Sequence, residues 1–107
     1  MRSDIERLKD IQEAIIAIEK YAEQGRSAFE NNELIQTWIL HHLLMLGEAA
    51  SRITDEFQQK HSEIPWSKII GMRNILVHDY FGIDFEIVWG VVEKELPQLK
   101  QLTNQIL

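Results

Sequence analysis

The chain has 107 residues, 45% of them hydrophobic, and no cysteine, so we expect one domain over residues 1–107 without disulfides or a thiolate metal site, in a reducing cytoplasm. Seventeen acidic and eleven basic residues give a net charge of −6, which argues against broad electrostatic attachment to DNA, RNA or anionic lipid. No membrane segment is expected, because no apolar run approaches the roughly 20 residues of a spanning helix.

The first third of the chain predicts one amphipathic helix followed by a connector. Apolar residues recur every three to four positions from Ile5 to Ala22, and charged residues occupy the other faces. We expect Ser3 or Asp4 to cap the start of this helix, which should end near Gly25. Residues 25–33, GRSAFENNE, read as a polar connector in which a short turn is possible.

One long helix is expected from about Asn32 to Gln59, spanning about 40 Å at about 1.5 Å per residue. Its inward stripe consists of apolar residues at helical spacing: Ile35, Trp38, Ile39, Met45, Leu46, Ala49, Ile53 and Phe57. The segment WILHHLLML is too apolar for one buried face. We therefore expect one face of this helix to pack on the core and another on a partner.

Pro65 predicts a break and the start of a third helix, which should end at His78 or Asp79. Gly71 inside this helix costs up to about 1 kcal/mol relative to alanine, and a close approach of two helices there would explain it. Residues 80–82 predict a turn.

Asp84 is a suitable N-cap for a fourth helix, which Pro97 bends. The pattern as a whole predicts an all-α fold, an up-and-down bundle of four to five helices. Trp38, Trp66 and Trp89 lie in apolar helical patterns and are expected to pack rather than to stack on bases.

Residues 73–80, RNILVHDY, form the main candidate site. Arg73 and His78 are five residues apart, or about 140° around a helix, and do not share a face, whereas Asn74 and His78 do. For Arg73 and His78 to act on one ligand, either the helix unwinds at its end or a second copy of the motif contributes the missing group across a two-fold axis.

The chemistry of these residues suits RNA. His78, near a helix end, can serve as general acid or base, and Arg73 can grip a phosphate and stabilise charge on phosphorus. These groups suffice for metal-independent cleavage in which the 2′-hydroxyl attacks the adjacent phosphate. On local spacing alone, Arg73 and His78 are more often helix-terminal surface groups, and Tyr80 with Phe81 is most simply an aromatic pair that anchors the turn.

Other polar residues have weaker interpretations. Glu48 either pairs with Arg52 one turn away or orients Arg73 or His78 across the bundle. His41 and His42 project about 100° apart and cannot bind one metal from a regular helix. If RNA is the substrate of this acidic chain, folding or a second subunit must assemble a basic patch, for which the candidates are Arg26, Arg52, Lys68 and Arg73.

The pattern Arg-x4-His-x-Tyr at Arg73, His78 and Tyr80, inside IPWSKIIGMRNILVHDYFGIDFEIVWGVVEKELPQL, resembles the HepT-like branch of the HEPN superfamily. The resemblance extends to LGEAA at residues 46–50. It implies a helical HEPN domain that dimerises and acts as a toxin endoribonuclease of a type II/VII-like toxin–antitoxin pair. In such a homodimer two Arg-x4-His motifs face each other, and neither a metal nor a cofactor is required.

The same resemblance implies a partner, a nucleotidyltransferase antitoxin of the MntA type that transfers AMP from ATP to Tyr80. The chain itself lacks a glycine-serine loop followed by paired aspartates, so it is not that transferase. The alternative is a non-catalytic helical subunit that helps a nucleotidyltransferase bind its substrate or nucleotide.

Overall fold

The computed structural model describes residues 2–107, and no strand occurs among them. Four long helical segments form a bundle: α1 (Asp4–Ala22), α3 (Glu33–Ser51), α5 (Trp66–His78), and a last one in which α6 (Phe85–Gly90) continues through a π-helical turn (Val91–Glu95) into α7 (Leu96–Ile106). Two short helices, α2 (Arg26–Asn31) and α4 (Asp55–Lys60), and a 3-10 turn (Tyr80–Gly82) complete it. The predicted all-α bundle of four to five helices is therefore confirmed.

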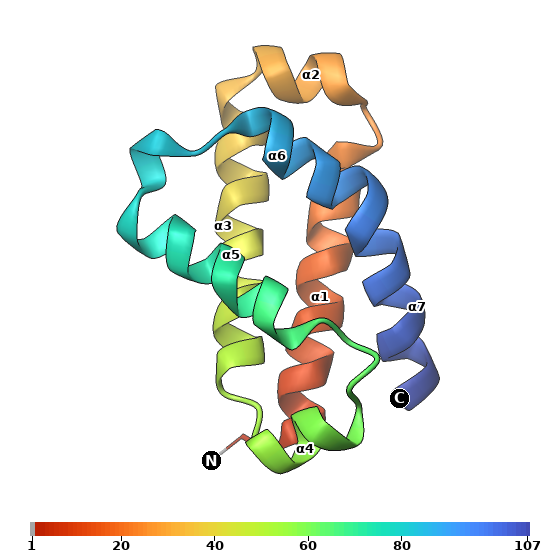
Figure 1. The fold of residues 1–107 in the computed structure, drawn as a ribbon. Helices are drawn as coiled ribbons and strands as arrows, with labels where there is room; N and C mark the ends of the chain where they lie inside the picture. Colours follow the sequence, from red (N-terminus) through yellow and green to blue (C-terminus); the bar gives the residue numbers. More distant parts are fainter. Residues whose placement is uncertain (1) are drawn as a thin grey trace.

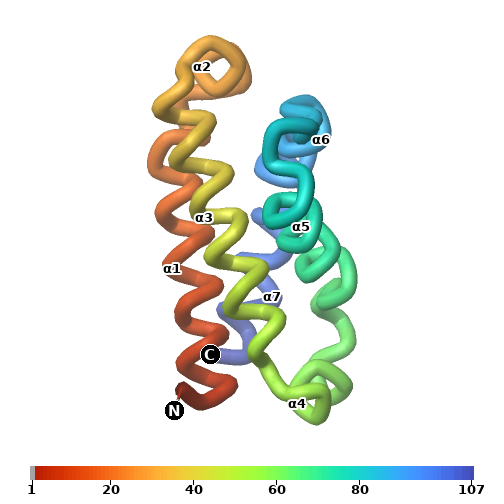
Figure 2. Tube along the Cα trace, turned by 90° about the vertical axis from the view of Figure 1, so that its left-hand side faces the viewer, coloured from red at the N-terminus to blue at the C-terminus, as the bar shows by residue number. Residues whose placement is uncertain are grey.

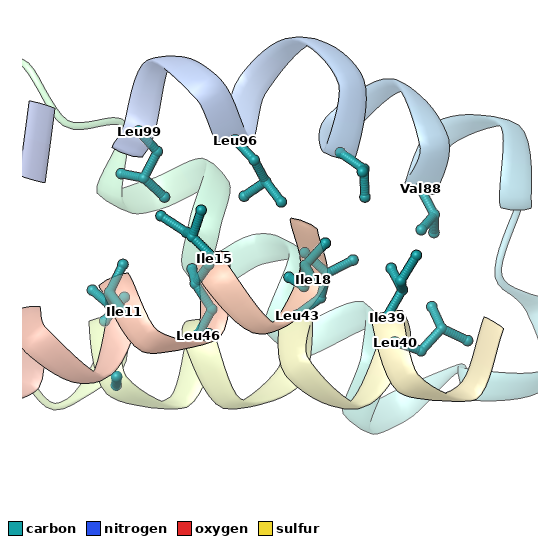
Figure 3. Close-up of a cluster of buried hydrophobic side chains, with 14 of the residues drawn as sticks. Ile11, Ile15, Ile18, Ile39, Leu40, Leu43, Leu46, Val88, Leu96 and Leu99 are labelled. Carbon is teal, nitrogen blue, oxygen red and sulfur yellow. The ribbon is translucent and has the colours of Figure 1, made fainter. Parts of the chain in front are cut away.

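The helices pack in two layers (Figures 1 and 2). Helices α1 and α3 run antiparallel side by side, and α5 with α6 lies across one side of that pair. Helix α7 packs on α1, so that aliphatic side chains from three directions meet in the core (Figure 3). No helix in the described part of the chain is long and apolar enough to cross a membrane.

The start of α1 follows its predicted cap. The Ser3 hydroxyl accepts from the backbone N–H of Glu6, and the Ser3 N–H donates to the Glu6 carboxylate, both at 3.1 Å. These hydrogen bonds form a capping box, and the one from the Ser3 N–H lowers the pKa of Glu6 below its ordinary value. Helix α1 ends at Ala22, and Gly25 has φ +95°, a left-handed conformation that suits glycine.

The prediction of a polar connector over residues 25–33 was wrong, because this stretch contains α2. Its one large apolar residue, Phe29, is fully buried and packs against the rings of Phe85 and Trp89 at centroid distances of 5.4 Å. A single aromatic among polar residues shows no helical period, so the sequence pattern does not reveal the helix.

The prediction of one long helix from Asn32 to Gln59 was also wrong beyond Ser51. Helix α3 begins as expected, with Asn32 as its N-cap. The chain then turns at Arg52 and begins α4 at Asp55. Thr54 holds this turn: its hydroxyl accepts from the Phe57 N–H, and its own N–H and hydroxyl donate to the Asp4 carboxylate at 2.9 and 2.7 Å. An N-cap tied to the first residue of α1 thus overrides the apolar pattern.

Both faces of α3 are covered within the chain, one by α1 and the other by α5. The expected inward stripe is correct at Ile35, Ile39 and Leu46 but wrong at Met45, which is 41% exposed. An outer stripe of α3 that includes Leu34 and Met45 remains open to solvent.

The second half of the chain follows its predicted boundaries. Pro65 precedes α5, which ends at His78, and Asp84 caps α6 by accepting from the Glu86 N–H at 2.9 Å. The bend expected at Pro97 takes the form of the preceding π-helical turn, where the Leu96 N–H bonds to the Val91 carbonyl. This wider turn accommodates a residue that lacks an N–H and crowds the carbonyl four positions earlier.

Trp66 and Trp89 are buried and pack as expected. Trp38 packs against the core only in part, and its indole N–H donates to the Ala17 carbonyl at 2.7 Å.

Phe29→Ala is expected to lower the free energy of unfolding by about 3–5 kcal/mol, because it removes a fully buried ring that fastens α2 to α6. The measurement is urea denaturation followed by circular dichroism. Ile16→Ala is the control: Ile16 is 58% exposed, and its loss should leave the midpoint nearly unchanged. An equal effect of both substitutions would contradict the placement of Phe29.

Candidate functional site

The candidate site is built where α5 crosses α3. A side chain at Gly47 would overlap the Cβ atom of Arg73 and lie 3.2 Å from its Cα atom, so only glycine fits at this crossing. The close helix approach was predicted at Gly71, and that prediction was wrong, because a Cβ atom there would meet nothing within 4 Å. Gly47 is the residue that brings the Arg73 backbone against α3.

This crossing places the Arg73 guanidinium beside the next residue of α3. Arg73 Nε donates to Glu48 Oε1 at 2.6 Å, and Arg73 Nη1 donates to Asn74 Oδ1 at 2.9 Å. The side chains of Arg73 and Glu48 are 29% and 28% exposed, so the ion pair is partly shielded from water. Two hydrogen bonds at different nitrogens hold the guanidinium plane in one orientation.

The geometry leaves part of Arg73 free to bind a ligand. A guanidinium carries five N–H donors, and Glu48 and Asn74 occupy one on Nε and one on Nη1. The Nη1/Nη2 edge retains three donors, enough to bind two oxygens of a phosphate.

Of the two interpretations of Glu48, the structure contains the contact with Arg73. No ion pair between Glu48 and Arg52 is found within residues 2–107. The contact joins α3 to α5 and could not be read from helical spacing, because it spans 25 positions of sequence.

The structure does not bring His78 to the same place. Helix α5 stays regular through His78, its last residue, so the unwinding that would join His78 to Arg73 does not occur. His78 and Asn74 lie on the same face of α5, and both are exposed. Among residues 2–107 the exposed His78 side chain has no hydrogen-bond or ion-pair partner.

Tyr80 begins the 3-10 turn directly after α5 and is 41% exposed. Its ring contacts Phe81 edge to face at a centroid distance of 5.7 Å. The interpretation of these two residues as a pair that anchors the turn to the core was wrong for Phe81, which is fully exposed.

The predicted basic patch does not form within one chain. Arg26 pairs with Glu30 and Glu86, and Lys68 pairs with Glu95. Arg73 is held by Glu48, which leaves Arg52 as the one candidate without an ion pair among residues 2–107. In that same range, no group of three or more His, Cys, Asp or Glu side chains could hold a metal ion.

Sequence reasoning missed Gly47, although it lies in the LGEAA segment. The available signal was a glycine in the middle of an otherwise apolar helix, where its cost of about 1 kcal/mol calls for a packing reason. To decide which of Gly47 and Gly71 lies at a close helix contact, one must know where the two helices cross. The sequence around either glycine does not give that crossing point.

A family model described as Ribonuclease HepT-like matches residues 11–106. The chain is 36% identical over 102 residues to "Probable ribonuclease HepT" of Thermococcus cleftensis, covering 92% of this chain and 91% of that protein. It is 34% identical over 97 residues to "Putative RNase TTE0752" of Caldanaerobacter subterraneus, covering 91% and 87% of the two chains. No solved structure is a significant match.

Gly47→Ala is expected to destabilise the fold by about 1–3 kcal/mol, because the added methyl group must push Arg73 and α5 away from α3. Gly71→Ala makes the same change in open space and should stabilise α5 by up to about 1 kcal/mol. The two variants are compared by thermal unfolding. Effects of the same sign would contradict the assignment of Gly47 as the crossing point.

Proposed function

Because this chain belongs to the HepT-like ribonuclease family, we propose that it is a toxin endoribonuclease that cleaves RNA without a metal, at a composite site shared by two copies. The observation that carries the proposal is the state of Arg73. Its guanidinium is oriented by Glu48 and Asn74 yet keeps a free donor edge. A phosphate of RNA is the natural ligand for that edge.

The reaction needs three groups around one phosphate. A His78 imidazole takes the proton of the 2′-hydroxyl, whose oxygen bonds to phosphorus as the bond from phosphorus to the 5′-oxygen breaks. The departing 5′-oxygen receives a proton from a second His78 in its imidazolium form. The products are a 2′,3′-cyclic phosphate and a free 5′-hydroxyl, and Arg73 stabilises the negative charge that builds on the phosphate. DNA lacks the 2′-hydroxyl and is not a substrate.

A homodimer supplies the groups that one chain keeps apart. His78 ends a regular helix and points away from Arg73 by about 140°, so a second copy across a two-fold axis brings its own His78 to the Arg73 of the first. The residues around His78 support an interface there. Ile75, Val77 and Phe81 are large, apolar and exposed, which is costly unless another surface covers them.

The antitoxin in this proposal is a nucleotidyltransferase of the MntA type. It transfers AMP from ATP to the Tyr80 hydroxyl, forming a phosphodiester bond and releasing pyrophosphate. The exposure of Tyr80, two residues after His78, supports this role, since the hydroxyl is reachable and the added nucleotide would stand beside the site. A bulky anion there would block the substrate phosphate by volume and by charge.

Wild-type protein is expected to cleave single-stranded RNA in the presence of EDTA and to leave 2′,3′-cyclic phosphate ends. His78→Ala should lose this cleavage and keep the dimer mass in light scattering. His61→Gln is the control, because His61 lies at the end of α4 and packs on Phe57. Cleavage that requires a divalent ion, or that survives in His78→Ala, would contradict the mechanism. RNA left intact by a dimer that binds the transferase would favour the non-catalytic subunit.

Incubation with the transferase and ATP is expected to add one AMP to Tyr80, and mass spectrometry of the peptide that contains residues 73–82 measures it. Tyr80→Phe should abolish the addition. Tyr21→Phe should retain it, because Tyr21 is the other tyrosine of the chain and packs against Trp38. AMP on any other residue would refute the assignment.

A further inference from the structure

An open groove of about 370 Å³ lies between α1 and α3 and adjoins the candidate site. Glu48, the residue that holds Arg73, lies within its α3 wall, and Arg52 lines the groove one helical turn later. Arg7 of α1 lines the groove as well. Figure 2 shows α1 and α3 side by side along this length. We call this feature the α1–α3 groove.

The two arginines of the groove differ from the other candidate cations. Arg26, Lys68 and Arg73 are each paired with a carboxylate. For Arg7 and Arg52, by contrast, the described residues provide no ion pair within 4.0 Å. Both guanidinium groups therefore keep their charge and their donors for a ligand.

The carboxylates in the same groove are mostly engaged. Asp10 is paired with Arg2 at 2.5 Å, and Glu48 is paired with Arg73 at 2.6 Å. Glu13 alone lines the groove without an ion pair in residues 2–107. Two unpaired arginines thus stand against one unpaired carboxylate, so the groove favours an anion although the chain is acidic overall.

Beyond His42 the groove becomes aromatic. His42 also lines a second, neighbouring opening of about 640 Å³ that includes Tyr21 and Trp38. The His42 and Trp38 rings lie 4.4 Å apart between centroids, and the Trp38 indole N–H is anchored to the Ala17 carbonyl. Unpaired cations followed by partly exposed aromatic rings are the combination that holds phosphates and unstacked bases.

We propose that the α1–α3 groove is a track for single-stranded RNA, in which Arg7 and Arg52 bind backbone phosphates next to the one held by Arg73. This inference rests on the proposed ribonuclease function and extends it from the cleaved bond to the neighbouring nucleotides. It assigns Arg7 and Arg52 to substrate binding and leaves the chemistry to Arg73 and His78. A duplex is a poor fit, because the aromatic end requires bases free of stacking partners.

The test measures binding of a fluorescein-labelled oligouridylate by anisotropy at several salt concentrations. The protein is the His78→Ala dimer, so that the RNA stays intact. Arg7→Gln and Arg52→Gln are each expected to weaken binding several-fold and to reduce the slope of log affinity against log salt by about 0.7. Lys9→Gln is the matched control, since Lys9 is an exposed cation on α1 that does not line the groove. It should leave the slope unchanged.

Three results would overturn the proposal. The first is that Arg7→Gln and Arg52→Gln leave the slope of log affinity against log salt unchanged. The second is that Lys9→Gln changes this slope as much as the arginine substitutions do. The third is a change of molar mass in either arginine variant, which would make the groove a contact between copies of the chain. Cleavage by the wild-type protein is assayed separately. RNA binding that depends on Arg7 and Arg52, without cleavage, would contradict the proposed function alone. Cleavage together with RNA binding that does not depend on these arginines would contradict only the proposal that the groove binds RNA.

Discussion

The contact on which the candidate site depends is the close crossing of α5 over α3 at Gly47. Because no side chain separates the two helices there, the Arg73 backbone sits against α3, and its guanidinium meets Glu48 at 2.6 Å. Two adjacent residues of α3 thus have different roles: Gly47 sets the distance between the helices, and Glu48 sets the orientation of the Arg73 guanidinium. A partly exposed ion pair contributes about 1 kcal/mol or less to stability, so its main effect is to reduce the freedom of a long side chain.

The same rigidity keeps the site incomplete in one chain. Helix α5 carries Arg73 and His78 on different faces and holds its hydrogen bonding to its last residue, so one copy cannot fold its histidine back toward its arginine. The two-fold arrangement proposed above would resolve this without any change of backbone. It would also cover the exposed apolar residues near His78, whose exposure is otherwise costly.

The parts of the fold set by local signals could be predicted from the sequence. The caps Ser3 and Asp84 and the break at Pro65 act over one helical turn, and each lies where the pattern indicates. Features set by distant contacts were missed. Thr54 ends a long apolar pattern through Asp4, 50 positions away, and Phe29 is buried by residues far along the chain. The motif around Arg73 was visible, whereas its Glu48 contact required the helix crossing.

Net charge is a poor guide to what this chain binds, because three of the five arginines in residues 2–107 are already paired with carboxylates. Arginines paired with carboxylates contribute little to the field at a distance, while unpaired arginines in a groove act on a ligand that enters it. Arg7 and Arg52 are of the second kind, and Glu48 lines the same groove. An RNA strand held there would pass beside Arg73, because the carboxylate that orients this arginine is also part of the groove wall.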